Sequence, residues 1–432
     1  MLELLPYQKE AAKFLVSRRR VVLGSEMGTG KTPVSIRAVR YLRRKKLLLP
    51  QNTYVVCPAS VKYNWANEIK RWDEGSTVQV VETKKDRIPR PSRGGGVDYI
   101  IFSYEIFRAL AEELPNCGVL IFDESHKLKN KSAQVTKKAL AFAESSQKVW
   151  FLTGTPMPNS IIDCYTTFDF CTFGNLGNYW QFAYNYCYVT KNRFGKKISG
   201  GKNLDELAEI SKAFLHRDTI EDHLEELPDE QIIRIDLPHT SRSKKYIADE
   251  EMKAVVEKLI AQESLTEEEK GVSEHIASMR RELAEAKEKQ AVEFIGNIME
   301  SGEQVIGFAH HLSLINPLAE RLGVPKIVGA TPAQERQRLI DEFQAGNIQC
   351  LVLGIQAASV GITLTKARIS VFLEVPWVPA DFDQARARIR RIGQKNFCTH
   401  YILSYPGTVD ETALYAMQRK AKTINKFWEA RK

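Results

Sequence analysis

The sequence predicts an α/β protein with two parallel-sheet units, one after the other along the chain. Short apolar runs, such as residues 119–122, are followed at once by polar residues. This arrangement is typical of buried parallel strands whose carboxyl ends carry the chemistry. A glycine-rich loop follows the first apolar run, whereas a second series of runs begins at residue 305 without such a loop. The two series predict two units of the same fold class.

The individual elements follow from these runs in chain order. In the first unit, apolar runs predict strands at residues 21–23, 54–57, 99–102, 119–122 and 149–152. Residues 158–226 lack strand runs and predict a helical insertion with a basic loop at 191–202. Residues 241–299 are rich in Ala, Glu, Lys and Leu and predict further helices. In the second unit we expect strands at 305–308, 326–328, 350–353 and 369–373, and helices at 333–345, 381–392 and 409–432.

These elements imply four segments. We expect lobe 1 at residues 1–157, its helical insertion at 158–228, a linker and helical insertion of lobe 2 at 229–300, and lobe 2 with a C-terminal basic helix at 301–432. The 432 residues carry a net charge of +9, which favours a polyanionic partner. No run of about 18 apolar residues and no signal peptide are present, so no membrane partner is expected. Seven scattered cysteines without a C-x-x-C pair indicate a reducing compartment such as the cytoplasm.

Residues 25–32, S-E-M-G-T-G-K-T, resemble a phosphate-binding loop between a strand and a helix. Gly28 and Gly30 allow the backbone N–H groups, with those of Met27 and Thr29, to face a polyphosphate. Lys31 supplies a positive charge, and the Thr32 hydroxyl can bind Mg²⁺. The usual pattern begins with Gly, but this loop begins with Ser25. An ordinary glycine-rich turn is the alternative interpretation.

Asp123 and Glu124 follow a predicted strand about ninety residues after the loop. In that position Asp123 can coordinate Mg²⁺, and Glu124 can polarise a water molecule beside the γ-phosphate. A solvated acidic loop is the alternative. His126 either couples this site to neighbouring motifs or forms a local hydrogen bond.

Arginines dominate residues 384–394, Q-A-R-A-R-I-R-R-I-G-Q. On a helix, Arg388 and Arg391 are three residues apart and share one face. Their guanidinium groups could stabilise negative charge on a transferring phosphoryl group, or could bind a nucleic-acid backbone. Arg386 and Arg390 are expected on other faces, at the surface or at a nucleic-acid backbone.

The order of these motifs resembles the Swi/Snf-type DNA translocases of helicase superfamily two, over nearly the whole chain. The L-K-N that follows D-E-S-H, at residues 128–130, and the R-I-G-Q at 391–394 are the most family-specific segments. Residues 5–8, L-P-Y-Q, resemble the adenine-sensing Q motif, and 152–156, L-T-G-T-P, resemble motif III. Further similar segments are 57–60 with Trp65, 103–105, 329–331 with Arg336 and Phe343, 359–364 and 377–379. Residues 308–311 and 407–410 resemble the annealing-helicase, fork-remodelling branch.

The resemblance implies two tandem RecA-like lobes that use ATP and Mg²⁺. It adds Gln8, Gly361 and Gln394 to the nucleotide site. It also implies residues that contact DNA, namely Ser60, Trp65, Ser103, Tyr104, Gly329, Thr331, Gln356 and Ser359. Residues that couple the motifs would be His126, Thr153, Gly154, Thr155 and Gln384. The chain departs from the family pattern at Ser25, Ser125, Ser359, Ala387 and Arg390. The phosphate lysine, the acidic pair and the two arginines remain, so we expect an active ATPase with altered coupling.

Two comparable units, only one of which has a phosphate-binding loop, indicate a two-lobed motor. We therefore expect an ATP-dependent translocase on double-stranded or branched DNA, a minimal motor that is a monomer when free. It would act in the cytoplasm, at the nucleoid or in a virus-infected bacterium, or in the nucleus of a eukaryote. One alternative is a strand-separating or RNA-stimulated helicase of the same superfamily. Another is a catalytically idle DNA-binding scaffold.

Overall fold

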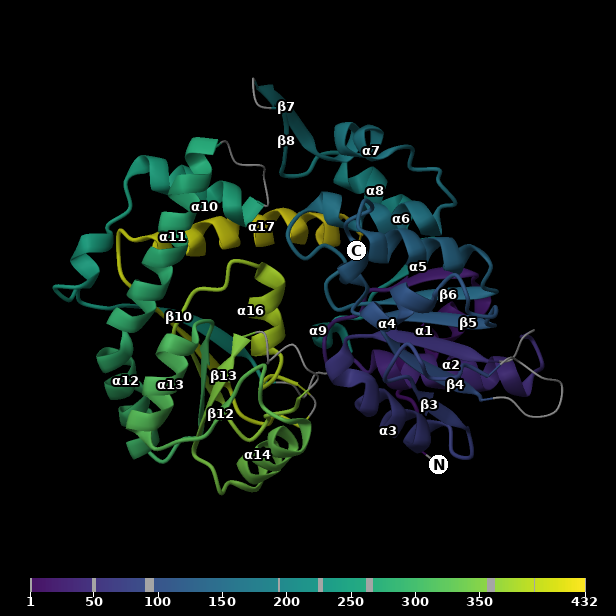
Figure 1. Ribbon diagram of the computed structural model, residues 1–432, viewed down its shortest axis with the longest axis horizontal. Helices are drawn as coiled ribbons and strands as arrows, with labels where there is room; N and C mark the ends of the chain where they lie inside the picture. Colours follow the sequence, from purple (N-terminus) through teal and green to yellow (C-terminus); the bar gives the residue numbers. More distant parts are fainter. Residues whose placement is uncertain are drawn as a thin grey trace. The chain divides into compact units, whose positions relative to one another are not determined.

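The computed structural model describes residues 2–48, 52–89, 97–192, 195–223, 228–261, 267–355, 362–391 and 393–431 (Figure 1). The chain forms two compact units. Lobe 1 consists of Met1–Tyr188, Gly201–His223 and Lys426–Lys432, and lobe 2 of Val189–Gly200 and Leu224–Asn425. The C-terminal helix contributes to both units, because the division falls after Asn425.

Lobe 1 contains a parallel sheet with the strand order β3-β4-β2-β5-β6-β1-β9 among the described residues. Its strands are β1 (Arg20–Leu23), β2 (Thr53–Cys57), β3 (Val78–Val80), β4 (Tyr99–Ser103), β5 (Val119–Asp123), β6 (Lys148–Leu152) and β9 (Leu215–His216). All five strands predicted for the first unit are confirmed. The short strands β3 and β9 were not predicted, because neither contains an apolar run of useful length.

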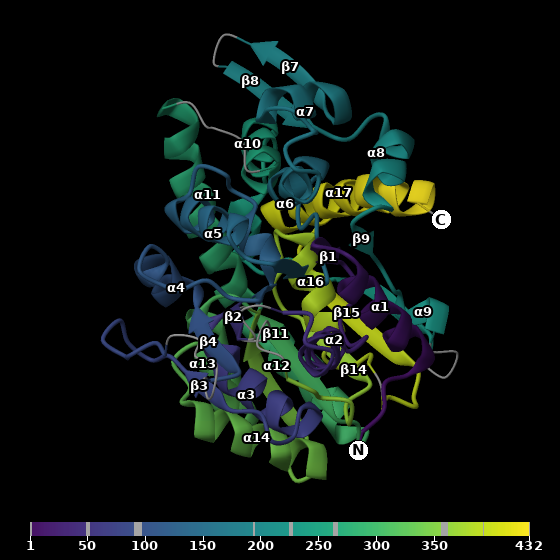
Figure 2. The same ribbon diagram turned by 90° about the vertical axis from the view of Figure 1, so that its right-hand side faces the viewer.

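The helices of lobe 1 place the motif residues at the carboxyl edge of this sheet. They are α1 (Pro6–Ser17), α2 (Lys31–Arg44), η1 (Ala59–Val61), α3 (Lys62–Trp72), α4 (Tyr104–Leu110), η2 (Ser125–Leu128), α5 (Gln134–Glu144), η3 (Ile161–Cys164), α6 (Tyr165–Cys171), α7 (Tyr179–Tyr186), α8 (Leu204–Ser211) and α9 (Ile220–His223). The first helix, α1, packs on α2, the helix that follows the phosphate-binding loop (Figure 2). The N-terminal segment is therefore held against that loop.

The segment predicted as a purely helical insertion also contains strands, so that prediction was wrong in this respect. Strands β7 (Tyr188–Asn192) and β8 (Gly195–Ser199) form a two-stranded sheet. Strand β9 pairs in parallel with β1, with Leu215 opposite Val22. A two-residue strand depends on its partner rather than on its own composition, and it gives no periodic signal in the sequence.

Lobe 2 contains a second parallel sheet, with the order β10-β15-β14-β11-β13-β12 among the described residues. Its strands are β10 (Glu230–Asp236), β11 (Val305–Ala309), β12 (Lys326–Ile327), β13 (Cys350–Gly354), β14 (Ile369–Phe372) and β15 (Cys398–Ser404). Strand β10 lies within a segment that was expected to be a linker with helices. It extends the sheet at its edge, with Glu230 opposite Cys398. The predicted α/β class with two parallel sheets is confirmed.

The helices of lobe 2 include the long C-terminal helix shown in yellow in Figure 1. They are η4 (Ser243–Tyr246), α10 (Glu250–Ala261), α11 (Glu267–Ala286), α12 (Glu288–Glu300), α13 (Leu312–Leu322), α14 (Ala333–Ala345), α16 (Pro379–Arg386) and α17 (Val409–Arg431). The prediction of a helix over 381–392 was wrong at its end, because α16 stops at Arg386. Among the helices of the described ranges, none combines the length and the apolar character that a membrane span requires.

One buried ion pair joins several elements in the core of lobe 2. The Lys287 side chain, at the start of α12, is fully buried. Its Nζ lies 2.5 Å from Asp410 Oδ2 and donates to the carbonyls of Leu373 and Leu403, each at 3.0 Å. The lysine thus joins α12, the ends of β14 and β15, and the start of α17. Its desolvation is offset by three partners.

We expect Lys287→Met to lower the free energy of unfolding by about 3–5 kcal/mol, because Asp410 would remain buried without its cation. Urea unfolding followed by circular dichroism measures this change. The control is Lys289→Met on the same helix, where the lysine is exposed. The control should change stability by about 0.5 kcal/mol or less. Equal stabilities of the two variants would contradict a structural role for the pair.

Candidate active site

The phosphate-binding loop connects β1 to α2, and its two glycines are required by geometry. Gly28 and Gly30 have φ angles of 85° and 88°, in the left-handed region that residues with a Cβ rarely adopt. A Cβ at Gly30 would also lie 2.4 Å from Gln8 Nε2. Thr29 is buried, and its hydroxyl donates to the carbonyl of Glu26 at 2.7 Å. The loop is therefore a tight, internally bonded turn that leads into a helix N-terminus.

Lys31 is held at the start of α2 by this loop. Its Nζ donates to the carbonyl oxygens of Ser25 at 2.8 Å and Glu26 at 2.9 Å. Burial lowers the pKa of Lys31 to about 8, although the charges of Glu124 and Asp123 oppose that shift. A lysine with weakly bound carbonyl partners and two carboxylates nearby is suited to bind a phosphate.

Gln8 connects α1 to the phosphate-binding loop. Its Nε2 donates to the carbonyl of Thr29 at 2.9 Å, and the Tyr7 hydroxyl donates to the same oxygen at 3.1 Å. The Leu5 N–H donates to Gln8 Oε1 at 3.0 Å. Gln8, which was predicted to belong to the nucleotide site, therefore lies beside the loop, where its contacts can respond to a nucleotide.

The acidic pair lies at the carboxyl end of β5. Burial, together with the neighbouring charge of Glu124, raises the pKa of Asp123 to about 6. Three donors surround Asp123. Trp65 Nε1 lies 2.8 Å from Oδ2, the Glu124 N–H lies 3.0 Å from Oδ1, and the Tyr104 hydroxyl lies 2.8 Å from the backbone carbonyl. Glu124 has a φ of 52°, a left-handed conformation that is uncommon outside glycine and is found at functional sites.

His126 joins the acidic pair to the segment after β6. Its Nδ1 lies 3.3 Å from Glu124 Oε2 and 3.2 Å from Thr153 Oγ1. The Thr155 N–H donates to the same hydroxyl at 3.0 Å. A Cβ at Gly154 would lie 2.7 Å from Met27 Cγ, so this segment also touches the phosphate-binding loop. The structure thus brings together the lobe 1 residues that were predicted to couple the motifs.

Three residues that were predicted to contact DNA are buried beside Asp123 or in the sheet. Trp65 is 1% exposed and Tyr104 is 4% exposed, and both donate towards Asp123. Ser103 is buried, and its hydroxyl accepts from the Ile106 N–H at the start of α4. Those side-chain predictions were wrong, because Trp65 and Tyr104 face Asp123 and Ser103 caps α4. Ser60, in contrast, is exposed.

The lobe 2 arginines Arg388 and Arg391 converge on one carbonyl. Their Nη1 atoms lie 3.4 Å and 3.0 Å from the oxygen of Ile362. They do not lie on a continuous α-helix, because after Arg386 the chain tightens into turns such as Arg388 N–H to Ala385 carbonyl at 3.1 Å. Burial lowers the pKa of Arg391. The predicted pair is therefore adjacent, although its predicted helical geometry was wrong.

Arg386 and Arg390 are ion-paired rather than directed to the surface or to a nucleic acid, which corrects the prediction. Arg386 Nη1 and Arg390 Nη1 lie 2.7 Å and 3.4 Å from Glu230 Oε1, and His400 Nε2 lies 2.9 Å from Glu230 Oε2. Although burial opposes the shift, the bond from His400 and the two arginines lower the pKa of Glu230 to about 2. No signal in the sequence marked Glu230, which is a single acidic residue at the start of an edge strand.

The remaining lobe 2 predictions have mixed outcomes. Gln394 is buried, and its Nε2 donates to the carbonyls of Thr365, Ala367 and Ile389, so its expected place in the nucleotide site was wrong. Gln384 is buried in α16. Gly329 is exposed, and the Thr331 hydroxyl accepts from the Val328 N–H at 2.9 Å. Gln356, Ser359 and Gly361 lie outside the described residues.

The residues of lobe 1 fit a magnesium-bound triphosphate. Asp123 offers a partly buried carboxylate, and Thr32 lies in the first turn of α2, directly after Lys31. Mg²⁺ is usually held by one or two protein oxygens together with phosphates and water, rather than by a complete protein cage. No cluster of three or more His, Cys, Asp or Glu suited to a metal occurs in the described ranges. The donors present therefore suit Mg²⁺ that arrives with its nucleotide.

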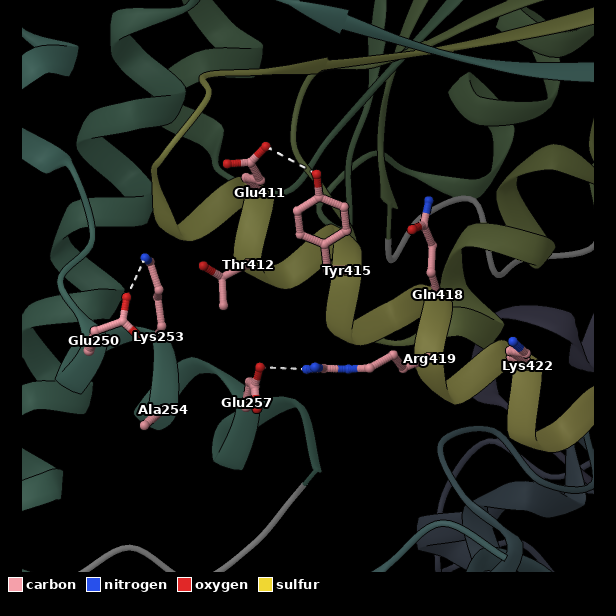
Figure 3. A pocket seen from close by; sticks show the side chains of 10 residues that line it. All are labelled: Glu250, Lys253, Ala254, Glu257, Glu411, Thr412, Tyr415, Gln418, Arg419 and Lys422. Atoms are coloured by element: carbon pink, nitrogen blue, oxygen red, sulfur yellow. Dashed lines mark hydrogen bonds and ion pairs between the residues drawn. The ribbon is translucent and has the colours of Figure 1, made fainter.

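A pocket of about 710 Å³ lies elsewhere, between α10 and α17 of lobe 2 (Figure 3). Four of its charged side chains form two ion pairs. Lys253 Nζ lies 2.7 Å from Glu250 Oε1, and Arg419 Nη2 lies 2.5 Å from Glu257 Oε1. None of the predicted motif residues lines it. The pocket is therefore separate from the residues predicted to act on the nucleotide.

Comparisons with known proteins identify two domains in the chain. Residues 7–291 match the SNF2-related domain, and residues 286–393 match the helicase conserved C-terminal domain. The SWI/SNF-related matrix-associated actin-dependent regulator of chromatin subfamily A-like protein 1 of Xenopus tropicalis is 30% identical over 98% of this chain and 44% of its own length. The DNA annealing helicase and endonuclease ZRANB3 of Mus musculus is 29% identical over 100% of this chain and 41% of its own length. The chain spans less than half the length of these curated relatives.

Among solved structures, the chain is similar to a Sulfolobus solfataricus SWI2/SNF2 ATPase core in complex with dsDNA. The similarity covers 99% of this chain and 95% of that one, with a TM-score of 0.48 and 22% identity.

We expect Trp65→Phe to lower the rate of ATP hydrolysis about tenfold while DNA affinity is unchanged. The substitution keeps an aromatic side chain, although a smaller one, but removes the N–H that binds Asp123, and a hydrogen bond to a charged group contributes about 1.5–3 kcal/mol. Steady-state hydrolysis and fluorescence anisotropy with labelled duplex measure the two properties. The control is Trp72→Phe on the same helix, whose Nε1 donates to Glu68. A loss of DNA affinity with normal hydrolysis would instead support the original DNA-contact prediction.

Proposed function

The chain belongs to the SNF2-related family of DNA-dependent ATPases, and we propose that it is an ATP-driven motor that moves along double-stranded DNA. One observation carries the proposal. Lys31, Asp123 and Glu124 lie at one edge of the lobe 1 sheet, and His126 links the acidic pair to Thr153. A phosphate-binding lysine, a magnesium-binding carboxylate and a positioned general base are the parts that phosphoryl transfer to water requires.

In lobe 1, each of these residues has a defined task. Lys31 exchanges its bonds to the Ser25 and Glu26 carbonyls for bonds to phosphate oxygens, which are stronger acceptors because they are charged. Asp123 and Thr32 would hold Mg²⁺, which would neutralise charge on the phosphates. Glu124 accepts a proton from the attacking water, and His126 holds the Glu124 carboxylate in place.

In lobe 2, Arg388 and Arg391 supply positive charge to the transferring phosphoryl group. Both guanidinium groups donate to the Ile362 carbonyl, so a phosphate would replace a neutral acceptor with a charged one. We infer that the lobes close on ATP and reopen after hydrolysis, and that this cycle moves the chain along one strand.

The DNA contacts are proposed at Ser60 of lobe 1 and at Gly329 and Thr331 of lobe 2, with Gln356 and Ser359 outside the described residues. Backbone N–H groups, hydroxyls and basic side chains would bind phosphates, so recognition would not depend on base sequence. The net charge of +9 supports a polyanionic partner. The name of the mouse relative includes DNA annealing, which supports branched DNA as a substrate. We propose that a monomer acts on chromosomal DNA, in the nucleoid or nucleus.

Lys31→Ala and Glu124→Gln should each reduce ATP hydrolysis by about 10²–10⁴-fold and leave DNA affinity within about twofold of the wild type. The first removes the phosphate-binding charge, and the second removes the general base but keeps its shape. A phosphate-release assay measures the rate. Lys45→Ala, at an exposed lysine just after α2, is the matched control. Substantial hydrolysis by either active-site variant would refute the assignment.

Duplex DNA should stimulate hydrolysis more than single-stranded DNA or RNA does. Since the contacts are to phosphates, the logarithm of the DNA association constant should fall linearly with the logarithm of salt concentration. Hydrolysis rates with duplex, forked and single-stranded DNA and with RNA, together with salt titrations, measure both effects. Stimulation by RNA but not by duplex DNA would favour an RNA-stimulated helicase. Absence of hydrolysis with every nucleic acid would favour an idle DNA-binding scaffold.

A further inference from the structure

The segment that follows β9 runs beside the first half of the phosphate-binding loop. The Gly24 N–H donates to the carbonyl of His216, and the Glu26 N–H donates to the carbonyl of Asp218, both at 2.8 Å. These bonds continue the pairing of β1 with β9 beyond the end of both strands. The first residues of the loop are therefore held as an extension of the sheet.

Asp218 is the centre of this contact. Its side chain is buried, and its carboxylate lies 2.9 Å from Ser25 Oγ, 3.0 Å from His216 Nε2 and 2.9 Å from His223 Nε2. In return, the Asp218 N–H donates to Ser25 Oγ at 3.1 Å. Burial alone would raise the pKa of Asp218, but the bonds and charge of His216, with Ser25 and His223, bring it below its ordinary value. The carboxylate is thus held ionised.

The groups around this carboxylate are themselves fixed. The His223 ring stacks on Tyr7, with centroids 4.5 Å apart and planes at 5°, and the His216 ring lies 5.1 Å from Phe14. Both aromatic residues belong to α1, the helix that carries Gln8. Two histidines on one buried carboxylate, each braced by a ring, form a rigid anchor.

A second carboxylate closes the contact from the other side. Glu26 Oε1 lies 2.9 Å from Arg217 Nη2, and the Ile220 N–H donates to Glu26 Oε2 at 3.1 Å. Arg217 also donates to the Gly24 carbonyl at 3.1 Å, and its guanidinium lies 3.9 Å from the centre of the Trp428 ring. The loop and the segment therefore each supply one carboxylate to the contact, Glu26 and Asp218 respectively. Neither can shift without breaking charged hydrogen bonds.

The residues held in this way are those that position the catalytic lysine. The two acceptors of Lys31 Nζ are the carbonyls of Ser25 and Glu26. We propose that Asp218 is a positioning residue for ATP turnover, because it fixes Ser25 and through it the place of Lys31. This inference rests on the proposed role of Lys31 at the phosphates. The Asp218 carboxylate therefore contacts the loop from a position 193 residues away in the sequence.

A carboxylate exchange between the two positions tests the proposal. Asp218→Ser should lower kcat/KM for ATP about tenfold, chiefly through KM, because the charged hydrogen bond that holds Ser25 is lost. Ser25→Asp should also lower it, because two carboxylates would then face each other. The double variant Ser25→Asp/Asp218→Ser should return to within about threefold of the wild type. Asp222→Ser, at an exposed carboxylate on α9, is the control and should match the wild type.

Hydrogen exchange measured by mass spectrometry provides a readout that does not depend on ATP hydrolysis. Asp218→Ser should speed amide exchange in residues 24–31, and the double variant should restore protection. A purely structural role would lower the melting temperature of Asp218→Ser, and the double variant Ser25→Asp/Asp218→Ser would not restore it. That result would overturn the proposal. Wild-type kcat/KM or unchanged exchange in Asp218→Ser would overturn it as well. Hydrolysis that survives in Lys31→Ala would instead refute the proposed function, and amide exchange would still decide whether Asp218 holds the loop.

Discussion

The crowding of three ionisable groups at one sheet edge is the constraint on which lobe 1 depends. Charges are costly to remove from water, and at this edge Lys31, Asp123 and Glu124 lie together, each partly shielded from it. The consequence is visible in the pKa of Lys31, about 8, and of Asp123, about 6. Trp65 of α3 donates to the Asp123 carboxylate, and Tyr104 of α4 donates to the Asp123 carbonyl. After β6, Thr153 contacts His126, which lies beside Glu124. The polar groups that the fold places around this site are therefore already oriented before substrate binds.

Lobe 2 also crowds charged groups together, and there the charges are positive. There, four arginines lie within one short segment and would repel one another unless they were compensated. Glu230 binds two of them together with His400, which leaves Arg388 and Arg391 directed to the Ile362 carbonyl. Asp218 of lobe 1 and Glu230 of lobe 2 have the same relation to their motifs. Asp218 is buried and Glu230 is partly buried, and each lies near a strand end and bonds to residues of a motif that is distant in the sequence.

The sequence predicted what depends on local order and missed what depends on long-range partners. Apolar runs identified the long strands, and the polar residues at their ends identified Lys31, Asp123 and Glu124. Asp218 and Glu230 gave no signal, because their partners lie 193 and 156 residues away. Trp65 and Tyr104 were predicted to contact DNA, but both are buried and donate towards Asp123, since a motif does not specify which way a side chain faces. The end of α16 was missed because the turns after Arg386 keep a helix-like spacing.

The cations of both lobes share a feature that explains how ATP could change them. Lys31 binds the carbonyls of Ser25 and Glu26, and Arg391 binds that of Ile362, so each cation rests on neutral backbone acceptors of its own lobe. A neutral carbonyl satisfies a buried cation only in part, and a phosphate oxygen satisfies it better. In the proposed mechanism, binding of ATP would therefore release carbonyls in the loops that carry the motifs. Loss of the γ-phosphate would return the cations to them, and this return would transmit the hydrolysis step to the backbone.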